Sequence, residues 1–199
     1  MIITLTPAEI NISDEFSCTF GHEIWDKLVT GKAIRRKNRT YTLFLHRRQL
    51  QLVCPLLKGG DGQNIVLWPA IKLPFRKYPV YVYLYATVLY LSSGLSMRDT
   101  AAQVRRHFGL DTFSHSTVSR ALRKLSDIAG ILSSLLPDSE PGMEESCPLI
   151  VRSRWDSGRL GRYSLLLQML CPVLDSRQMI PYSSLLNYRY FNHVQKFIV

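Results

Sequence analysis

Apolar residues recur at helical spacing in two adjacent stretches between Leu95 and Leu125. Residues three and four apart lie on the same side of an α-helix, so each stretch predicts an amphipathic helix with one buried face. The buried face of the first helix would comprise Met97, Ala101, Val104 and Phe108. That of the second helix would comprise Val118, Ala121, Leu122 and Leu125.

Capping residues mark the ends of the first helix. Ser96 can act as the N-cap, and the acidic Asp99 follows three residues later in a capping-box-like position. Gly109 comes directly after the last periodic residue, where helices commonly end. The first helix is therefore expected to start after Ser96 and to stop at Gly109.

A short turn separates the two helices, and Leu110 and Phe113 are expected to fill the gap between them. The second helix would begin at Ser114 or Ser116, because either hydroxyl can accept a hydrogen bond from a free backbone N–H. Many bacterial proteins present a helix to the DNA major groove in this way, with two short helices around a turn. The turn here is longer than in the compact repressor-type motif.

The second helix is basic on the side opposite its apolar face. Side chains near the N-terminus of a recognition helix reach base edges, whereas Arg and Lys further along neutralise phosphates. The candidates for base-edge contacts are His115, Ser116, Thr117 and Arg120. The candidates for phosphate contacts in the two helices are Arg105, Arg106, Arg123 and Lys124. DNA recognition is the favoured interpretation, and a helical hairpin with a solvated basic face is the alternative.

The segment Tyr78–Leu91 is strongly apolar and rich in tyrosine. Its uninterrupted apolar stretch is shorter than the ~20 residues that a membrane span needs, and the tyrosine hydroxyls would need partners in lipid. We therefore expect a buried helix that supports the next two helices, rather than membrane insertion. Together the three would form the unit typical of helix-turn-helix domains.

Before this segment the chain predicts a small β-rich module. Short runs rich in β-branched, aromatic and aliphatic residues predict strands at 40–45, 49–54 and 64–68, with a glycine-rich loop at 58–62. The predicted fold class is α+β, mainly α. The expected domains are a β-rich basic module at 1–68, a Pro-rich linker at 69–79, a helix-turn-helix domain at 80–136, an acidic linker at 137–146 and a C-terminal extension of unknown role at 147–199.

Composition points to an anionic partner. The chain has 199 residues, is 46% hydrophobic and carries a formal net charge of +10, so it can bury a core and still attract nucleic acid. The N-terminal residues lack the pattern of a signal peptide, and the 4 cysteines are scattered without a CxxC pair. We expect a cytoplasmic location.

A second basic cluster lies in the β-rich module, where aromatic Tyr41 and Phe44 are interleaved with cations. Such a patch suits phosphate contacts with aromatics available for stacking, although a solvated strand face explains it equally well. The candidates for phosphate contacts here are Arg35, Arg36, Lys37, Arg39, Arg47 and Arg48. Metal binding is not expected, because Cys18, His22 and Cys54 are fewer ligands than a closed zinc site requires.

Several short motifs follow one another in an informative order. They are SCTFGH at 17–22, GKAIRR at 31–36, HRR at 46–48, CPLL at 54–57, LPFRKY at 73–78 and STVSR at 116–120. This order resembles that of an uncharacterised bacterial family related to the N-terminal part of certain transposases. The resemblance implies a zinc-ribbon-like module of two CPxC-type knuckles followed by a helix-turn-helix. Phe20 and Leu57 stand where metal ligands would be, so hydrophobic packing would replace the metal in this chain.

Catalysis is not expected. A DDE-type transposase needs three carboxylates that hold metal ions, and only Asp156 and Asp175 are candidates after the acidic linker. The chain also lacks a Gly-rich phosphate loop and a nucleophile elbow. The expected function is DNA recognition or regulation without an enzyme activity or a cofactor. Double-stranded DNA is the expected partner, with a second copy of the chain or a separate transposase or recombinase subunit as further ones; RNA, an acidic protein or a membrane remain the alternatives.

Overall fold

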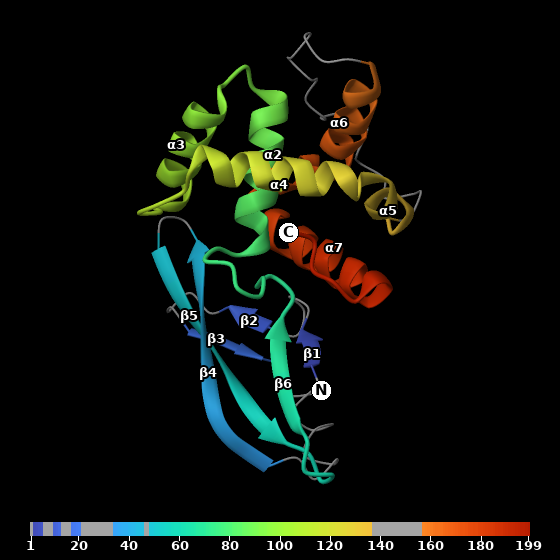
Figure 1. Ribbon diagram of the computed structural model, residues 1–199. Helices are drawn as coiled ribbons and strands as arrows, with labels where there is room; N and C mark the ends of the chain where they lie inside the picture. The colour runs from blue at the N-terminus through green and yellow to red at the C-terminus, as the bar shows by residue number, and fades with distance from the viewer. Residues whose placement is uncertain (1, 6–9, 13–16, 21–33, 46–47, 137–156) are drawn as a thin grey trace.

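The protein has a strand-rich end and a helical end, as the computed structural model shows (Figure 1). The structure describes residues 2–5, 10–12, 17–20, 34–45, 48–136 and 157–199. The fold is α+β and mainly helical, as predicted. One hydrophobic cluster extends from Tyr41 and Phe44 in the strands into the helices, so the two ends share a core.

The strands form one mixed sheet. They are β1 (Ile2–Leu5), β2 (Ile10–Ile12), β3 (Ser17–Phe20), β4 (Ile34–Leu45), β5 (Arg48–Lys58) and β6 (Asn64–Pro69). Their order is β1-β6-β5-β3-β2, and β4 runs antiparallel to β5 from the pair Ile34 and Lys58 to the pair Leu45 and Arg48. The strands predicted at 40–45, 49–54 and 64–68 are confirmed, and the first two are longer than predicted.

The helices pack around a central one. They are α2 (Val80–Ser92), α3 (Met97–Phe108), α4 (His115–Asp127), α5 (Ala129–Ser134), α6 (Ser157–Leu170) and α7 (Met179–Val194), with a 3-10 turn η2 at Cys171–Leu174. Helices α3, α4, α6 and α7 all contact α2. In Figure 1, α4 crosses α2, and α7 lies between α4 and the sheet.

Helix α2 is buried on nearly all sides, which confirms the prediction for the tyrosine-rich segment. The Tyr81 hydroxyl has partners within the protein, since it donates to the Phe44 carbonyl at 2.5 Å and accepts from the Phe44 N–H at 3.0 Å. Among the described residues, no helix combines the length and the apolar character that crossing a membrane requires.

Residues 69–79 pack closely between the sheet and the helices. Ala70, Ile71 and Leu73 are buried. The Asn187 side chain on α7 donates from Nδ2 to the Ala70 carbonyl at 2.6 Å, and its Oδ1 accepts from the Ile198 N–H at 3.0 Å. One buried side chain therefore holds the last helix, the chain end after it and the segment between sheet and helices together.

Candidate nucleic-acid interface

Helix α3 has the caps that the sequence predicts. The Ser96 hydroxyl accepts from the Asp99 N–H at 3.2 Å and lies 2.6 Å from the Asp99 carboxylate, to which it donates. The helix ends at Gly109, which has a left-handed backbone with φ of 66°. In the predicted face, Ala101, Val104 and Phe108 are buried and Met97 is partly buried. These local signals fix where α3 stops and where the turn begins.

Replacing Gly109 with Ala should lower the free energy of unfolding by about 1–2 kcal/mol, because a Cβ disfavours the left-handed backbone. Gly161 provides the control: it lies inside α6 with open space where a Cβ would be. Gly161→Ala should raise stability by about 0.5–1 kcal/mol. Urea denaturation of both variants measures the difference, and equal effects of the two substitutions would contradict the role of Gly109.

The turn after Gly109 is packed. Leu110 and Phe113 are both buried, as predicted, and the Phe113 ring lies 5.6 Å from the Tyr78 ring. The Arg105 guanidinium donates to the Phe113 carbonyl at 2.7 Å. Arg105, predicted to contact phosphate, thus also braces the turn that sets the position of α4.

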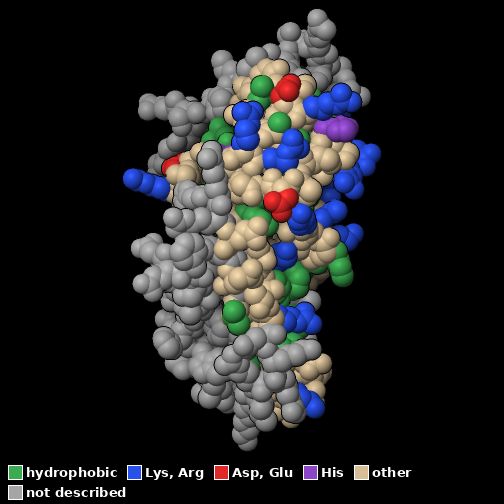
Figure 2. Space-filling model, turned by 90° about the vertical axis from the view of Figure 1, so that its left-hand side faces the viewer, with side chains coloured by type: hydrophobic (Ala, Val, Ile, Leu, Met, Phe, Trp, Pro, Cys, Tyr) green, Lys and Arg blue, Asp and Glu red, His purple; other side chains and the backbone are tan. Residues whose placement is uncertain are grey.

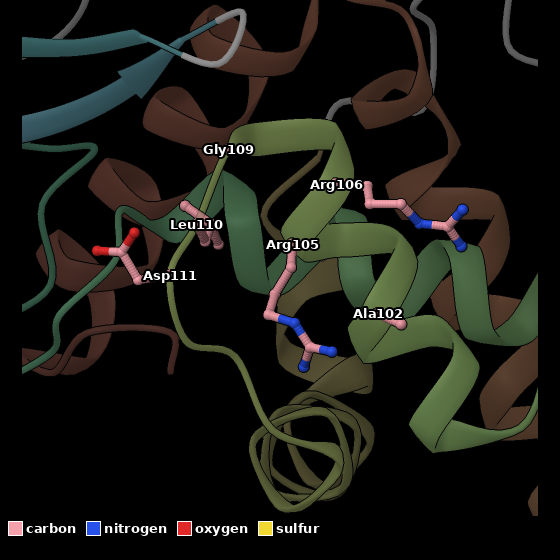
Figure 3. A pocket seen from close by; sticks show the side chains of 6 residues that line it. All are labelled: Ala102, Arg105, Arg106, Gly109, Leu110 and Asp111. Carbon is pink, nitrogen blue, oxygen red and sulfur yellow. The ribbon is translucent and has the colours of Figure 1, made fainter.

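A hollow of about 660 Å³ lies beside this turn. Figure 3 shows that Arg105 extends from α3 toward α4, whereas Arg106 points to another side of α3. Asp111 lines the same hollow on the turn. Arg106 is exposed, while part of the Arg105 guanidinium faces the turn.

Helix α4 divides into a buried and a basic side. Of the two serines that could cap it, Ser114 does so: its Oγ accepts from the Thr117 N–H at 3.3 Å. The predicted stripe Val118, Ala121, Leu122 and Leu125 is buried. The opposite side carries the exposed side chains of His115, Ser116, Arg120, Arg123 and Lys124, with Thr117 partly buried. The structure thus places all the predicted base-edge residues in the first two turns of one helix.

Cations outside α4 extend this basic side, and sequence reasoning missed them. Arg76 and Lys77 precede α2, and Lys196 follows α7; all are exposed. Arg76 lines hollows beside α4 together with Arg120, Lys124 and Lys196. Figure 2 shows Lys and Arg side chains gathered along one margin of the helical half, with few acidic ones among them. The run LPFRKY at 73–78 contains two of these cations, but only the fold shows that Arg76 lies beside α4.

Burial and neighbouring cations lower the pKa of one lysine in this group, Lys124. Burial lowers the pKa of Lys124, and the positive charges of Arg76 and Lys196 lower it further. Like charges held this close repel one another. An anion placed between them would relieve the repulsion, so the electrostatics favour an anionic ligand at this side of α4.

The second predicted cluster lies on the long antiparallel pair β4–β5. Arg39 is exposed. Arg35, Arg36 and Lys37 lie in β4, whose pairing with β5 shifts register at this point, and Arg48 starts β5. For these four the structure describes the backbone only, and Arg47 lies outside the described residues.

The Arg48 end of this strand pair is close to the start of α4. The Phe44 ring, one residue before the Leu45–Arg48 pair, lies 5.6 Å from the Tyr78 ring, which in turn contacts Phe113 just before α4. The fold therefore brings one end of the basic strands and the N-terminal end of α4 to the same region.

Metal ligands do not cluster in the part of the chain that the structure describes: it holds no group of three or more His, Cys, Asp or Glu that could bind an ion. Cys54 is buried. His22 and the Cys18 side chain are beyond the described part. The segments of both knuckle-like motifs are neighbours in the sheet, since β3 pairs with β5 at Cys18 and Leu52.

No protein-family model matches the chain, and curated proteins yield no similar sequence. The functional argument therefore rests on the geometry and charge of the chain itself.

Proposed function

We propose that this chain is a DNA-binding protein of the helix-turn-helix type. Helix α4 would enter the major groove, which is wide enough to admit an α-helix. One observation carries the proposal: α4 buries one side completely and exposes on the other a surface with Arg120, Arg123 and Lys124. Helices α2 and α3 both contact α4, and the three would serve as the three-helix unit that such domains use.

The order of residues along α4 assigns the contacts. His115, Ser116, Thr117 and Arg120 lie toward its N-terminus and would contact base edges, whereas Arg123 and Lys124 would bind phosphates. Arg106, and the part of Arg105 not engaged with the turn, would add phosphate contacts from α3. In β4–β5, Arg48 would supply a second phosphate contact, because its end of the strand pair lies near the start of α4. Arg35, Arg36, Lys37 and Arg39 lie further along the pair and would contact phosphates at a greater distance from α4.

The biological role that fits is recognition without a catalytic domain of its own. The order of motifs in the chain supports a relationship to the DNA-recognition part of transposases. In this view the sheet takes the place of a zinc ribbon and packs without metal. The chain would act as a recognition module for a separate transposase or recombinase subunit, or as a regulator.

The salt dependence of duplex binding tests this proposal. If about six phosphates are contacted, the logarithm of the affinity should fall with the logarithm of the salt concentration with a slope of roughly −5. Fluorescence anisotropy with a labelled DNA duplex measures the slope. Absence of binding to any duplex at low salt would refute the proposal.

A double-stranded RNA competitor separates DNA from RNA. The major groove of A-form RNA is too deep and narrow to be contacted by an inserted helix. Double-stranded RNA should therefore displace the DNA duplex poorly at equal phosphate concentration. Equal displacement would show that charge alone drives binding and that α4 is not inserted in a groove.

A further inference from the structure

Phe75 is placed where an aromatic side chain is least expected. Its side chain is fully exposed, at 105% of the reference area. Its backbone is left-handed, with φ of 57°, a conformation that glycine adopts easily and other residues rarely. The ring contributes nothing to the core, and the backbone conformation is unfavourable for phenylalanine. The stability of the protein therefore does not explain a phenylalanine at this position.

The turn around Phe75 is held from several sides. The Arg76 N–H donates to the Leu73 carbonyl at 3.4 Å, so residues 73–76 form a β-turn with Pro74 second and Phe75 third. With φ positive at the third position this is a type II turn, which normally has Gly there. Lys72 Nζ donates to the Arg76 carbonyl at 2.9 Å, and Leu73 is buried. The protein thus keeps a strained residue fixed while its ring projects into solvent.

Cations surround the exposed ring. Phe75 lines a hollow of about 190 Å³ together with Arg76, Lys77, Arg120 and Lys124. A second hollow of about 520 Å³ joins Phe75 to Arg76, Lys124 and Lys196. Among the described residues that line either hollow, none is acidic. A flat apolar ring beside positive charges suits a ligand with a planar ring and a negative charge.

We infer that Phe75 and the cations around it bind an unpaired nucleotide of a DNA strand, with the base stacked on the Phe75 ring and its phosphates against Arg76 and Lys124. Stacking on an aromatic residue next to a basic groove is how proteins hold single strands. A base pair in the interior of a duplex cannot present its face in this way, since its neighbours cover both sides. The ring therefore favours an unpaired nucleotide over the phosphates of a duplex alone.

This inference rests on the proposed function and extends it. Arg120 and Lys124 line the hollow and also lie on the basic side of α4. A duplex bound by α4 would bring its strands close to Phe75. DNA with both a paired and an unpaired part is then the preferred ligand of the whole surface.

The test compares a blunt duplex with the same duplex carrying a single-stranded thymine overhang, both bound by the full chain. The overhang should tighten binding roughly 5- to 100-fold, as expected for stacking of a base on an aromatic side chain. Phe75→Ala should remove this gain and leave the affinity for the blunt duplex unchanged. Phe75→Trp should keep the gain, because the indole ring also stacks.

Phe75→Gly separates the loss of the ring from a loss of folding. Glycine fits the left-handed backbone, so this variant should have a higher melting temperature than the wild type while it loses the gain from the overhang. Equal affinity of the wild type for both DNAs, or an equal loss on both DNAs in Phe75→Ala, would overturn the inference while the proposed function stands. Failure to bind the blunt duplex would instead refute the proposed function.

Discussion

Replacing Asn187 with Ala is expected to destabilise the protein by about 2–6 kcal/mol, because two buried backbone groups lose their hydrogen-bond partners at about 1–3 kcal/mol each. Those groups are the Ala70 carbonyl and the Ile198 N–H, which the Asn187 amide joins across 117 and 11 residues. Asn187 itself is completely buried. Urea denaturation followed by circular dichroism gives the free energy of unfolding.

Ser183 is a matched control on the same helix. It is as buried as Asn187, but its hydroxyl has no hydrogen-bond partner within the described part of the chain, and the same holds for Ser184. Ser183→Ala removes an unsatisfied polar group and should leave stability unchanged or raise it slightly. If both variants lost the same free energy, the effect of Asn187 would be one of helix packing and not of its amide.

Replacing Arg120 and Arg123 together with Ala is expected to weaken duplex binding by roughly 10- to 1,000-fold, since a lost base contact of an Arg costs about 1–3 kcal/mol and a lost phosphate contact adds to it. The salt slope should become shallower by about one or two, according to the number of phosphates released. Both side chains are exposed, so the fold should be retained. Anisotropy titrations at several salt concentrations give both quantities.

The double variant Arg162→Ala and Arg177→Ala removes the same charge at two residues that line neither of the hollows beside α4. Arg162 lies on α6 and Arg177 between η2 and α7, and both are exposed. Remote charges are screened over about 8–10 Å at physiological salt, so this variant should bind almost as tightly as the wild type. Similar losses in both double variants would mean that net charge, and not α4, determines affinity.

Local signals account for the elements that the sequence predicts well. Helices α3 and α4 carry their own caps at Ser96, Gly109 and Ser114, and their apolar stripes match the buried faces that the structure shows. The runs of β-branched, aromatic and aliphatic residues in β4, β5 and β6 likewise predict these strands from the sequence alone. Helix α2 was predicted from its length and tyrosine content, because a segment that is apolar on all sides must be buried.

Long-range contacts explain what the sequence left out. β1 is only 4 residues long and pairs with β6 more than 60 positions later, so nothing local marks it. The role of Asn187 depends on Ala70, which lies 117 positions earlier in the sequence. Arg76 and Lys196 were missed as members of the candidate site because they are distant in sequence from α4, and the positive φ of Phe75 has no signature in the residue type.

The contact between Tyr81 and Phe44 has a consequence for the kind of DNA target that fits. It ties α2, against which α4 packs, to the Arg48 end of the strand pair β4–β5. The two proposed DNA contacts, helix α4 and the Arg48 end of the strand pair, are therefore joined through the core of the protein. Each base pair inserted between their contact points turns one against the other by about 35°, since the duplex completes a turn in about 10–10.5 base pairs. The affinity would thus depend on the number of base pairs between the two contact points as well as on the base sequence.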